Sequence, residues 1–166
     1  MAKTLVSAPM DTRADRGADY LIFINYGEGA THEQPKWCLI GGQRTADLSD
    51  TRSELDATNK TSGEYGDFEA GFKTGELSME LVCYPNDEGY LQVREAYDKN
   101  LKVDILRWHA KGRSERIWCS VAEFSDSASY DDMVTTTTKF KLTGTPIYYD
   151  NMADPRIPTP SPGVGA

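Results

Sequence analysis

Apolar and polar residues alternate along several stretches of this chain, and a period of two residues is typical of half-buried β-strands. From Thr74 to Val82 the alternation gives an apolar face and an acidic face that carries Glu76 and Glu80. Between residues 103 and 108 the apolar face shifts by one position, which predicts a β-bulge near Ile105. The predicted strands cover residues 20–26, 37–40, 74–82, 103–108, 116–124 and 134–142, and residues 147–149 extend the last strand past Pro146.

One segment has the period of a helix instead. Apolar residues from Tyr90 to Leu101 follow one another at steps of three, four and four. Asn86 or Asp87 can cap the first turn, and acidic residues close to a helix start are favourable. The pattern predicts one amphipathic helix over residues 88–99.

Residues 43–72 form a polar stretch about twice as long as the 12–15 residues that connections in compact domains rarely exceed. A short alternating piece over 52–58 and spaced aromatic residues argue against disorder. Its few apolar side chains, apart from small alanines, are Leu48, Leu55, Tyr65, Phe68 and Phe72. We therefore expect a semi-ordered arm that projects from a β-core and is held in place by a neighbouring molecule.

With 166 residues, the chain is long enough for one domain with a real core. The formal net charge is −8, and it is concentrated in residues 43–99, which hold 13 acidic and 6 basic residues. Binding to a nucleic-acid backbone needs clustered lysine and arginine, so the acidic middle argues against it. An ordinary solvated surface accounts for the charge equally well.

The three cysteines, Cys38, Cys83 and Cys119, stand apart in apolar β-like runs. We expect buried free thiols rather than a disulfide framework or a zinc site. The N-terminus has no apolar signal region, and no window is long and apolar enough for a membrane span. These features indicate a chain that is made and kept in a reducing cytoplasm.

Residues that carry chemistry are few. His32 falls in a polar loop and His109 at a strand end, and we expect both to be solvated or edge histidines. No serine stands in a nucleophile-elbow context. Trp108, Trp118 and the Tyr148–Tyr149 pair suit either a sugar-stacking platform or ordinary packing, and packing is the commoner use. We expect no catalytic residues, no metal site and no cofactor.

Two segments make the sequence resemble a known family. Glu54–Gly63 reads acidic-x-Asp-x-Thr-x-Lys-x-Ser-Gly, and Phe68–Lys73 supplies an aromatic residue and then Gly-Phe-Lys. This pattern resembles the signature of phage major tail (tail tube) proteins of the long-tailed siphophage type. The closing segment Lys139–Gly144 and its lead-in Asp131–Thr135 resemble the same family, so the likeness covers about Ala18–Tyr149.

The resemblance implies a mainly β fold, namely a β-sandwich or flattened barrel with one flanking α-helix and a long projecting arm. It divides the chain into an N-terminal arm (1–19), a tail-tube β-sandwich domain (20–149) containing an assembly loop (43–72), and a Pro/Gly-rich C-terminal tail (150–166). The tail departs from the shorter end that the family pattern leads us to expect.

The resemblance also implies a structural virion protein without enzymatic activity, whose copies form stacked, hexameric rings. DNA would pass through the lumen without specific binding. Further partners would be the tape measure, tail terminator and distal tail proteins, with no membrane contact. The chain would reside in the virion tail, and in the host cytoplasm during assembly.

Within this hypothesis, the arm residues expected to contact neighbouring subunits and rings are Arg44, Asp47, Asp50, Arg52, Glu54, Asp56, Lys60, Tyr65, Phe68 and Phe72. Glu76 and Glu80 are the acidic candidates for the lumen wall, where they would repel phosphates. Three alternatives remain open: a soluble β-sandwich module that binds carbohydrate, an enzyme on a β-scaffold, and the tube protein of a contractile tail, gene transfer agent or secretion system.

Overall fold

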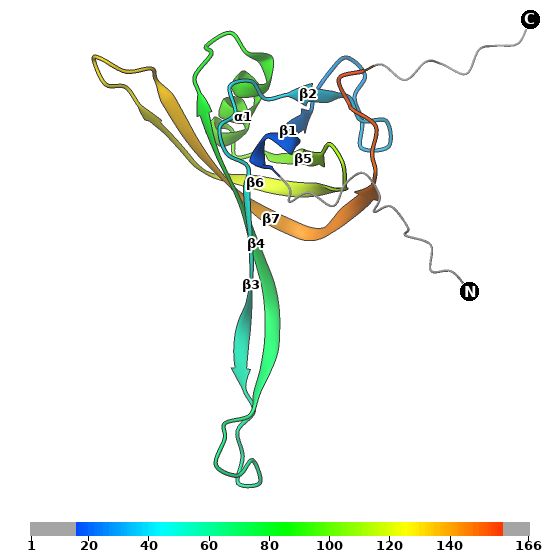
Figure 1. Cartoon of the computed structure of the whole chain (residues 1–166), viewed down its shortest axis with the longest axis vertical. Helices are drawn as coiled ribbons and strands as arrows, with labels where there is room; N and C mark the ends of the chain where they lie inside the picture. The colour runs from blue at the N-terminus through cyan, green and yellow to red at the C-terminus, as the bar shows by residue number, and fades with distance from the viewer. Residues whose placement is uncertain (1–15, 158–166) are drawn as a thin grey trace, which may run out of the picture.

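The computed structural model describes residues 16–157, and seven strands in it form one antiparallel sheet with the order β2-β1-β5-β6-β7-β4-β3 (Figure 1). The elements are the 3₁₀ turn η1 (Gly17–Asp19), β1 (Tyr20–Asn25), β2 (Trp37–Leu39), β3 (Asp47–Asp56), β4 (Phe68–Val82), α1 (Glu88–Asp98), β5 (Lys102–His109), β6 (Arg113–Ser127) and β7 (Thr135–Asp150). The expected mainly β fold with one helix and a projecting arm is confirmed. The remainder of the expected N-terminal arm (1–15) and of the C-terminal tail (158–166) lies outside the described residues.

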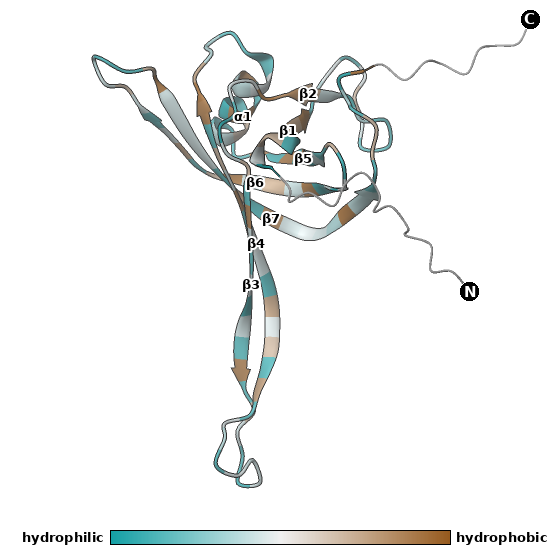
Figure 2. Ribbon diagram, in the orientation of Figure 1, coloured by the Kyte–Doolittle hydropathy of each residue, from teal (hydrophilic) through white to brown (hydrophobic). Residues whose placement is uncertain are grey.

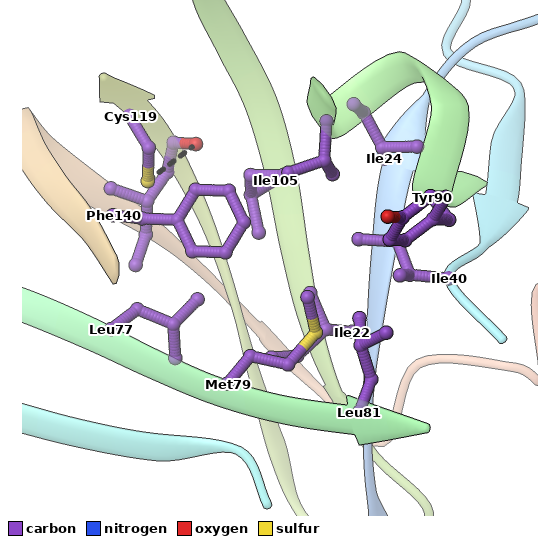
Figure 3. Packing of buried hydrophobic residues seen from close by; sticks show 12 residues of the cluster. Ile22, Ile24, Ile40, Leu77, Met79, Leu81, Tyr90, Ile105, Cys119 and Phe140 are labelled. Carbon is purple, nitrogen blue, oxygen red and sulfur yellow. Dashed lines mark hydrogen bonds between the residues drawn. The ribbon is translucent and has the colours of Figure 1, made fainter. Parts of the chain in front are cut away.

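The main core lies inside the curl of the sheet and is covered by α1. Leu77, Met79 and Leu81 of β4 point into it with no more than 1% exposure, as the alternation over 74–82 predicts. Phe140 of β7 meets them from the neighbouring strand (Figure 3). The buried members of this core cluster are Ile22, Ile24, Ile40, Leu77, Met79, Leu81, Tyr90, Val93, Ile105, Ile117, Cys119 and Phe140.

A second apolar cluster lies on the other face of the sheet. Phe23, Leu106 and Trp108 are buried there, and Met152 packs against them from the segment that follows β7. Because this cluster buries the outer face of β5 as well, the strand is apolar on both sides. The predicted bulge near Ile105 is therefore wrong: β5 pairs in regular register with both neighbours, and the nearest register shifts lie in the pairing of β6 with β7.

Helix α1 begins one residue after its cap, as the sequence predicts. The Asp87 carboxylate accepts a hydrogen bond from the backbone N–H of Tyr90 at 2.9 Å and another from Gly41 at 3.0 Å. The second bond ties the helix start to the end of β2. Gly89 packs against this segment so closely that a Cβ there would lie 2.7 Å from the Leu39 carbonyl oxygen.

Gln43 joins two strands that the sheet order places far apart. Its backbone forms a β-bridge with Leu81 of β4. Its side-chain amide accepts a hydrogen bond from the N–H of Ile22 in β1 (2.8 Å) and donates to the carbonyls of Ile22 (2.7 Å) and Ile40 (2.5 Å). The amide thus replaces a missing strand pairing and closes the curled sheet between β1 and β4.

All three cysteines are free thiols, as expected. Only Cys119 is fully buried, whereas Cys38 and Cys83 are half-buried at the rim of the core. Burial raises the pKa of the Cys119 thiol to about 12, so this group is a poor nucleophile. No helix in residues 16–157 is long and apolar enough to cross a membrane.

Replacing Gln43 by alanine should lower the free energy of unfolding by about 2–4 kcal/mol. The variant leaves the N–H of Ile22 and the carbonyl of Ile40 without the Gln43 amide, whereas the Ile22 carbonyl keeps the N–H of Ile40 at 3.2 Å. Each of the two orphaned groups costs about 1–3 kcal/mol. Urea unfolding followed by tryptophan fluorescence measures the change. Gln34→Ala, at an exposed loop position, is the matched control and should stay within about 0.5 kcal/mol of the parent chain. Equal stability of the two variants would contradict the closing role of Gln43.

Candidate assembly interface

The long polar stretch forms a β-hairpin rather than a semi-ordered loop. Strand β3 pairs with the outer part of β4, and this hairpin, which we call the arm (residues 47–75), projects away from the rest of the chain (Figures 1 and 2). Every residue of β3 from Ser49 to Asp56 is exposed. Within the arm, only Leu48 packs against the core cluster. The prediction of a projecting arm with little apolar burial of its own is confirmed.

The arm exposes its aromatic side chains. Phe72 is 89% exposed, Tyr65 85% and Phe68 60%. Phe68 and Phe72 both belong to the outer part of β4. The pairing shifts from Arg52–Lys73 to Glu54–Ala70, so β4 carries one extra residue, a bulge that includes Phe72. Large apolar side chains this exposed on a projecting element are typical of a surface that another molecule covers.

The polar residues of the arm mostly bond to the arm itself. The Asp50 carboxylate pairs with Lys73 at 2.7 Å across the two strands, and Arg52 donates to the carbonyl of Gly71 at 3.4 Å. Asp56 accepts a hydrogen bond from the backbone N–H of Thr58 at 2.9 Å. These contacts stiffen the hairpin.

The tip of the arm, residues 57–67, is also internally bonded. The Asn59 side chain accepts from the N–H of Thr61 (2.9 Å), and the hydroxyl of Ser62 accepts from the N–H of Asn59 (3.0 Å). Gly63 has φ of +74°, a backbone region that glycine tolerates at no steric cost. Asn59, Ser62 and Gly63 therefore shape the tip, while Lys60 is exposed to solvent.

A second, shorter hairpin, made by the end of β6 and the start of β7, also projects (Figure 1). At its tip, Tyr130 is fully exposed and Met133 is 66% exposed, next to Asp131 and Asp132. The alternation pattern leaves residues 125–133 between two predicted strands and does not predict that they project. The sequence signal for this feature is the presence of Tyr130 and Met133 in an otherwise polar run.

The acidic candidates Glu76 and Glu80 lie on the outer face of the sheet, where each has a basic partner. Lys141 pairs with Glu76 and lowers the pKa of that carboxyl group, and Arg44 lies 3.5 Å from Glu80. Lys139 pairs with a third carboxylate, Glu123, at 3.0 Å. We call this set of six residues the charged wall: Arg44, Glu76, Glu80, Glu123, Lys139 and Lys141.

The two histidines do not form solvated sites. His109 is 3% exposed, and its ring lies against Tyr20 with centroids 4.4 Å apart, so the expectation of an edge histidine is wrong. His32 is half-buried, and Arg116 donates to its carbonyl at 2.6 Å. Asp104 in turn accepts two hydrogen bonds from Nε and Nη2 of Arg116, at 3.0 and 2.5 Å.

The aromatic residues do not make one sugar-binding platform. Trp108 is 5% exposed, under Met152, and its indole N–H donates to the Met152 carbonyl at 3.0 Å. Trp118 is 42% exposed and stacks on His32 instead. Among residues 16–157, no group of three or more histidine, cysteine or acidic side chains is placed to hold a metal ion.

No protein-family model and no curated protein matches this sequence. Solved structures match its fold. A chain from the tail of an empty gene transfer agent particle, refined with C6 symmetry, has a TM-score of 0.70 at 15% identity, over 82% of this chain and 99% of that one. The SPP1 tail tube matches with a TM-score of 0.66 at 12% identity, over 83% and 80% of the two chains. A chain of the anti-feeding prophage baseplate has a TM-score of 0.64 at 12% identity, over 87% and 100%. The chain therefore has the fold of tail tube proteins.

Replacing Phe68 and Phe72 together by alanine should leave the free energy of unfolding within about 0.5 kcal/mol of the parent chain, because exposed side chains contribute little to the monomer. Phe140→Ala, in the core, should cost about 3–5 kcal/mol. Urea unfolding of dilute protein measures both. A loss above 2 kcal/mol in the double variant would mean that the arm is packed against its own subunit.

Proposed function

We propose that this chain is the protomer of a tail tube: a structural protein, without catalysis, whose copies assemble into stacked rings. The observation that carries the proposal is the arm, which leaves the core with three exposed aromatic side chains and, among residues 16–157, joins the rest of the sheet at its base. The tail tube fold supports it, because the matched structures come from a tail, a tail tube and a baseplate.

In the proposed assembly, the exposed aromatic side chains of the arm bind a neighbouring subunit or ring. The contact is heterologous, since an arm inserts into a different surface of the next copy, and such contacts close into rings when the rotation permits. Phe68, Phe72 and Tyr65 are the expected anchors, because buried aromatic residues dominate the binding energy of interfaces. Hexameric rings are the symmetry that we propose.

The role as a virion component follows from the same reasoning. Further partners would be the tape measure, tail terminator and distal tail proteins, with assembly in the host cytoplasm. The matched structures include both a gene transfer agent and an anti-feeding prophage. A long phage tail is the assignment that the sequence signature favours, and a related tube is the second candidate.

The charged wall is the proposed lining of the channel. Its three carboxylates and three basic groups balance, and each lysine and the arginine face a carboxylate within 3.5 Å. Duplex DNA carries one negative charge per about 1.7 Å of its axis, so unpaired cations in a long channel would hold it. Glu76, Glu80 and Glu123 would keep the cations engaged and let DNA slide.

Purified protein should form rings or tubes in negative-stain microscopy. The Phe68→Ala/Phe72→Ala double variant should remain folded but lose assembly, with sedimentation shifting to the monomer. Leu91→Ala, which removes a 43% exposed side chain from α1, is the matched control and should assemble like the parent. A chain in which Asn-Gly replaces Arg52–Lys73 joins the paired residues Thr51 and Thr74 by a two-residue turn and should behave like the double variant. Parent protein that stays monomeric at high concentration would contradict the proposed assembly into a tube.

Replacing Glu76, Glu80 and Glu123 together by glutamine should make assembled particles retain duplex DNA. The change frees three cations per copy, so retention should be strong at low salt and fall steeply as salt rises. Co-sedimentation of DNA with the particles, after microscopy has shown intact assembly, measures it. The arm variant Glu54→Gln/Glu64→Gln/Glu69→Gln carries the same charge change and should retain none. Equal DNA retention by both variants would mean that the charged wall does not line the channel.

A further inference from the structure

A hollow of about 500 Å³ opens at the base of the arm, between β3, β4 and the second half of β7. We call it the arm-base hollow. Gly75 and Leu142 are the less exposed part of its lining, and Arg52, Lys73 and Tyr148 are exposed beside them. A Cβ at position 75 would lie 2.6 Å from Cδ2 of Leu142, so a side chain there would fill part of the hollow. The volume is within the usual range of binding pockets.

The arm-base hollow carries an excess of positive charge beside an aromatic ring. Asp50 neutralises Lys73, since their side chains pair at 2.7 Å. Arg52 donates a hydrogen bond of 3.4 Å to the carbonyl of Gly71 and forms no ion pair with any of residues 16–157. The guanidinium of Arg113 lies 3.5 Å from the centroid of the Tyr148 ring and adds a further positive charge at this wall. The hollow therefore suits a ligand that combines negative charge with an apolar or aromatic part.

The hairpin between β6 and β7, which we call the short hairpin (residues 125–134), presents that combination at its tip. Tyr130 is fully exposed and Met133 is 66% exposed. Between them stand Asp131 and Asp132, and neither forms an ion pair within the described part of the chain. The N–H of Asp132 donates to the carbonyl of Ser129 at 3.2 Å, and the Asp132 carboxylate accepts from the N–H of Met133 at 2.8 Å. These bonds shape the tip before it binds, which lowers the entropic cost of docking.

The short hairpin and the arm-base hollow of one copy lie at different places along β7. The hairpin joins β7 at Thr135, and Leu142 of the hollow stands seven residues further along the strand, a distance of about 23 Å. The hairpin also extends from this point away from the arm (Figure 1). A short hairpin that fills the hollow therefore belongs to another copy. Such a contact joins two different surfaces and is heterologous, so it can repeat from copy to copy.

We propose that the tip of the short hairpin of one copy docks in the arm-base hollow of the next copy, an inference that rests on the proposed assembly of copies into rings. Tyr130 packs on Tyr148 and Leu142 as the central anchor, and Asp131 pairs with Arg52. Buried aromatic anchors supply most of the energy of an interface, and charge pairs select the partner and fix the register. Because Arg52 belongs to the arm, the docked hairpin also braces the base of its neighbour's arm.

Charge reversal tests the pairing of the two surfaces in the full chain. Asp131→Lys/Asp132→Lys should raise the critical concentration for assembly about fivefold, and so should Arg52→Glu. The three changes combined should return it towards the parent value, because the pair is restored with opposite signs. The matched control Glu28→Lys/Glu33→Lys makes the same charge change on the exposed loop between β1 and β2 and should assemble like the parent. A combined variant that assembles no better than either part would overturn the pairing.

Photo-crosslinking locates the docked tip without relying on altered charge. Particles are assembled from equal amounts of nitrogen-15-labelled and unlabelled chain that carry p-benzoylphenylalanine in place of Tyr130. Crosslinks should join the probe to the tryptic peptide Leu142–Arg156 in pairs of mixed label, whereas the probe at Tyr26, 43% exposed on another loop, should give no such link. Links within one copy, or to other peptides of assembled particles, would overturn this inference alone. Parent protein that does not assemble at all would overturn the proposed function as well.

Discussion

The pairing of β4 with β7 is the interaction on which the architecture depends. Strand β4 is 15 residues long and continuous, so its inner part is a core strand and its outer part is half of the arm. From Glu76 to Val82 it pairs with β7, and from Gly75 outward it pairs with β3 alone. Because one uninterrupted strand passes through both regions, the direction of the arm is fixed by the register of the core.

Side chains of β4 are buried in the core part of the strand and exposed in the arm part. In the core, the inward residues Leu77, Met79 and Leu81 of β4 are buried in the main core cluster. In the arm, Phe68 and Phe72 are 60% and 89% exposed within the described residues. A two-stranded hairpin is marginal on its own in water, and here it is continued by the sheet at its base and stiffened by pairs such as Asp50–Lys73. The aromatic side chains are thus free for a partner without being needed by the fold.

Periodicity predicted the strands of the core, the helix with its Asp87 cap and the projecting stretch. It did not predict that this stretch is a regular hairpin, because Asp, Ser and Arg have low strand preference and the bulge near Ser53 interrupts the alternation. The bulge expected at Ile105 was wrong because a second apolar cluster buries the outer face of β5. The closing role of Gln43 was invisible, since one glutamine in a polar run carries no signal of its distant partners.

The continuity of β4 has a mechanical consequence. Hydrogen bonds between antiparallel strands run perpendicular to the strand axis, so a pull on the arm along its length loads every bond between Glu76–Lys141 and Val82–Thr135 in shear. All of these bonds share the force at once, whereas a sideways pull would open them one after another. The arm therefore resists a pull along its length more strongly than a sideways pull.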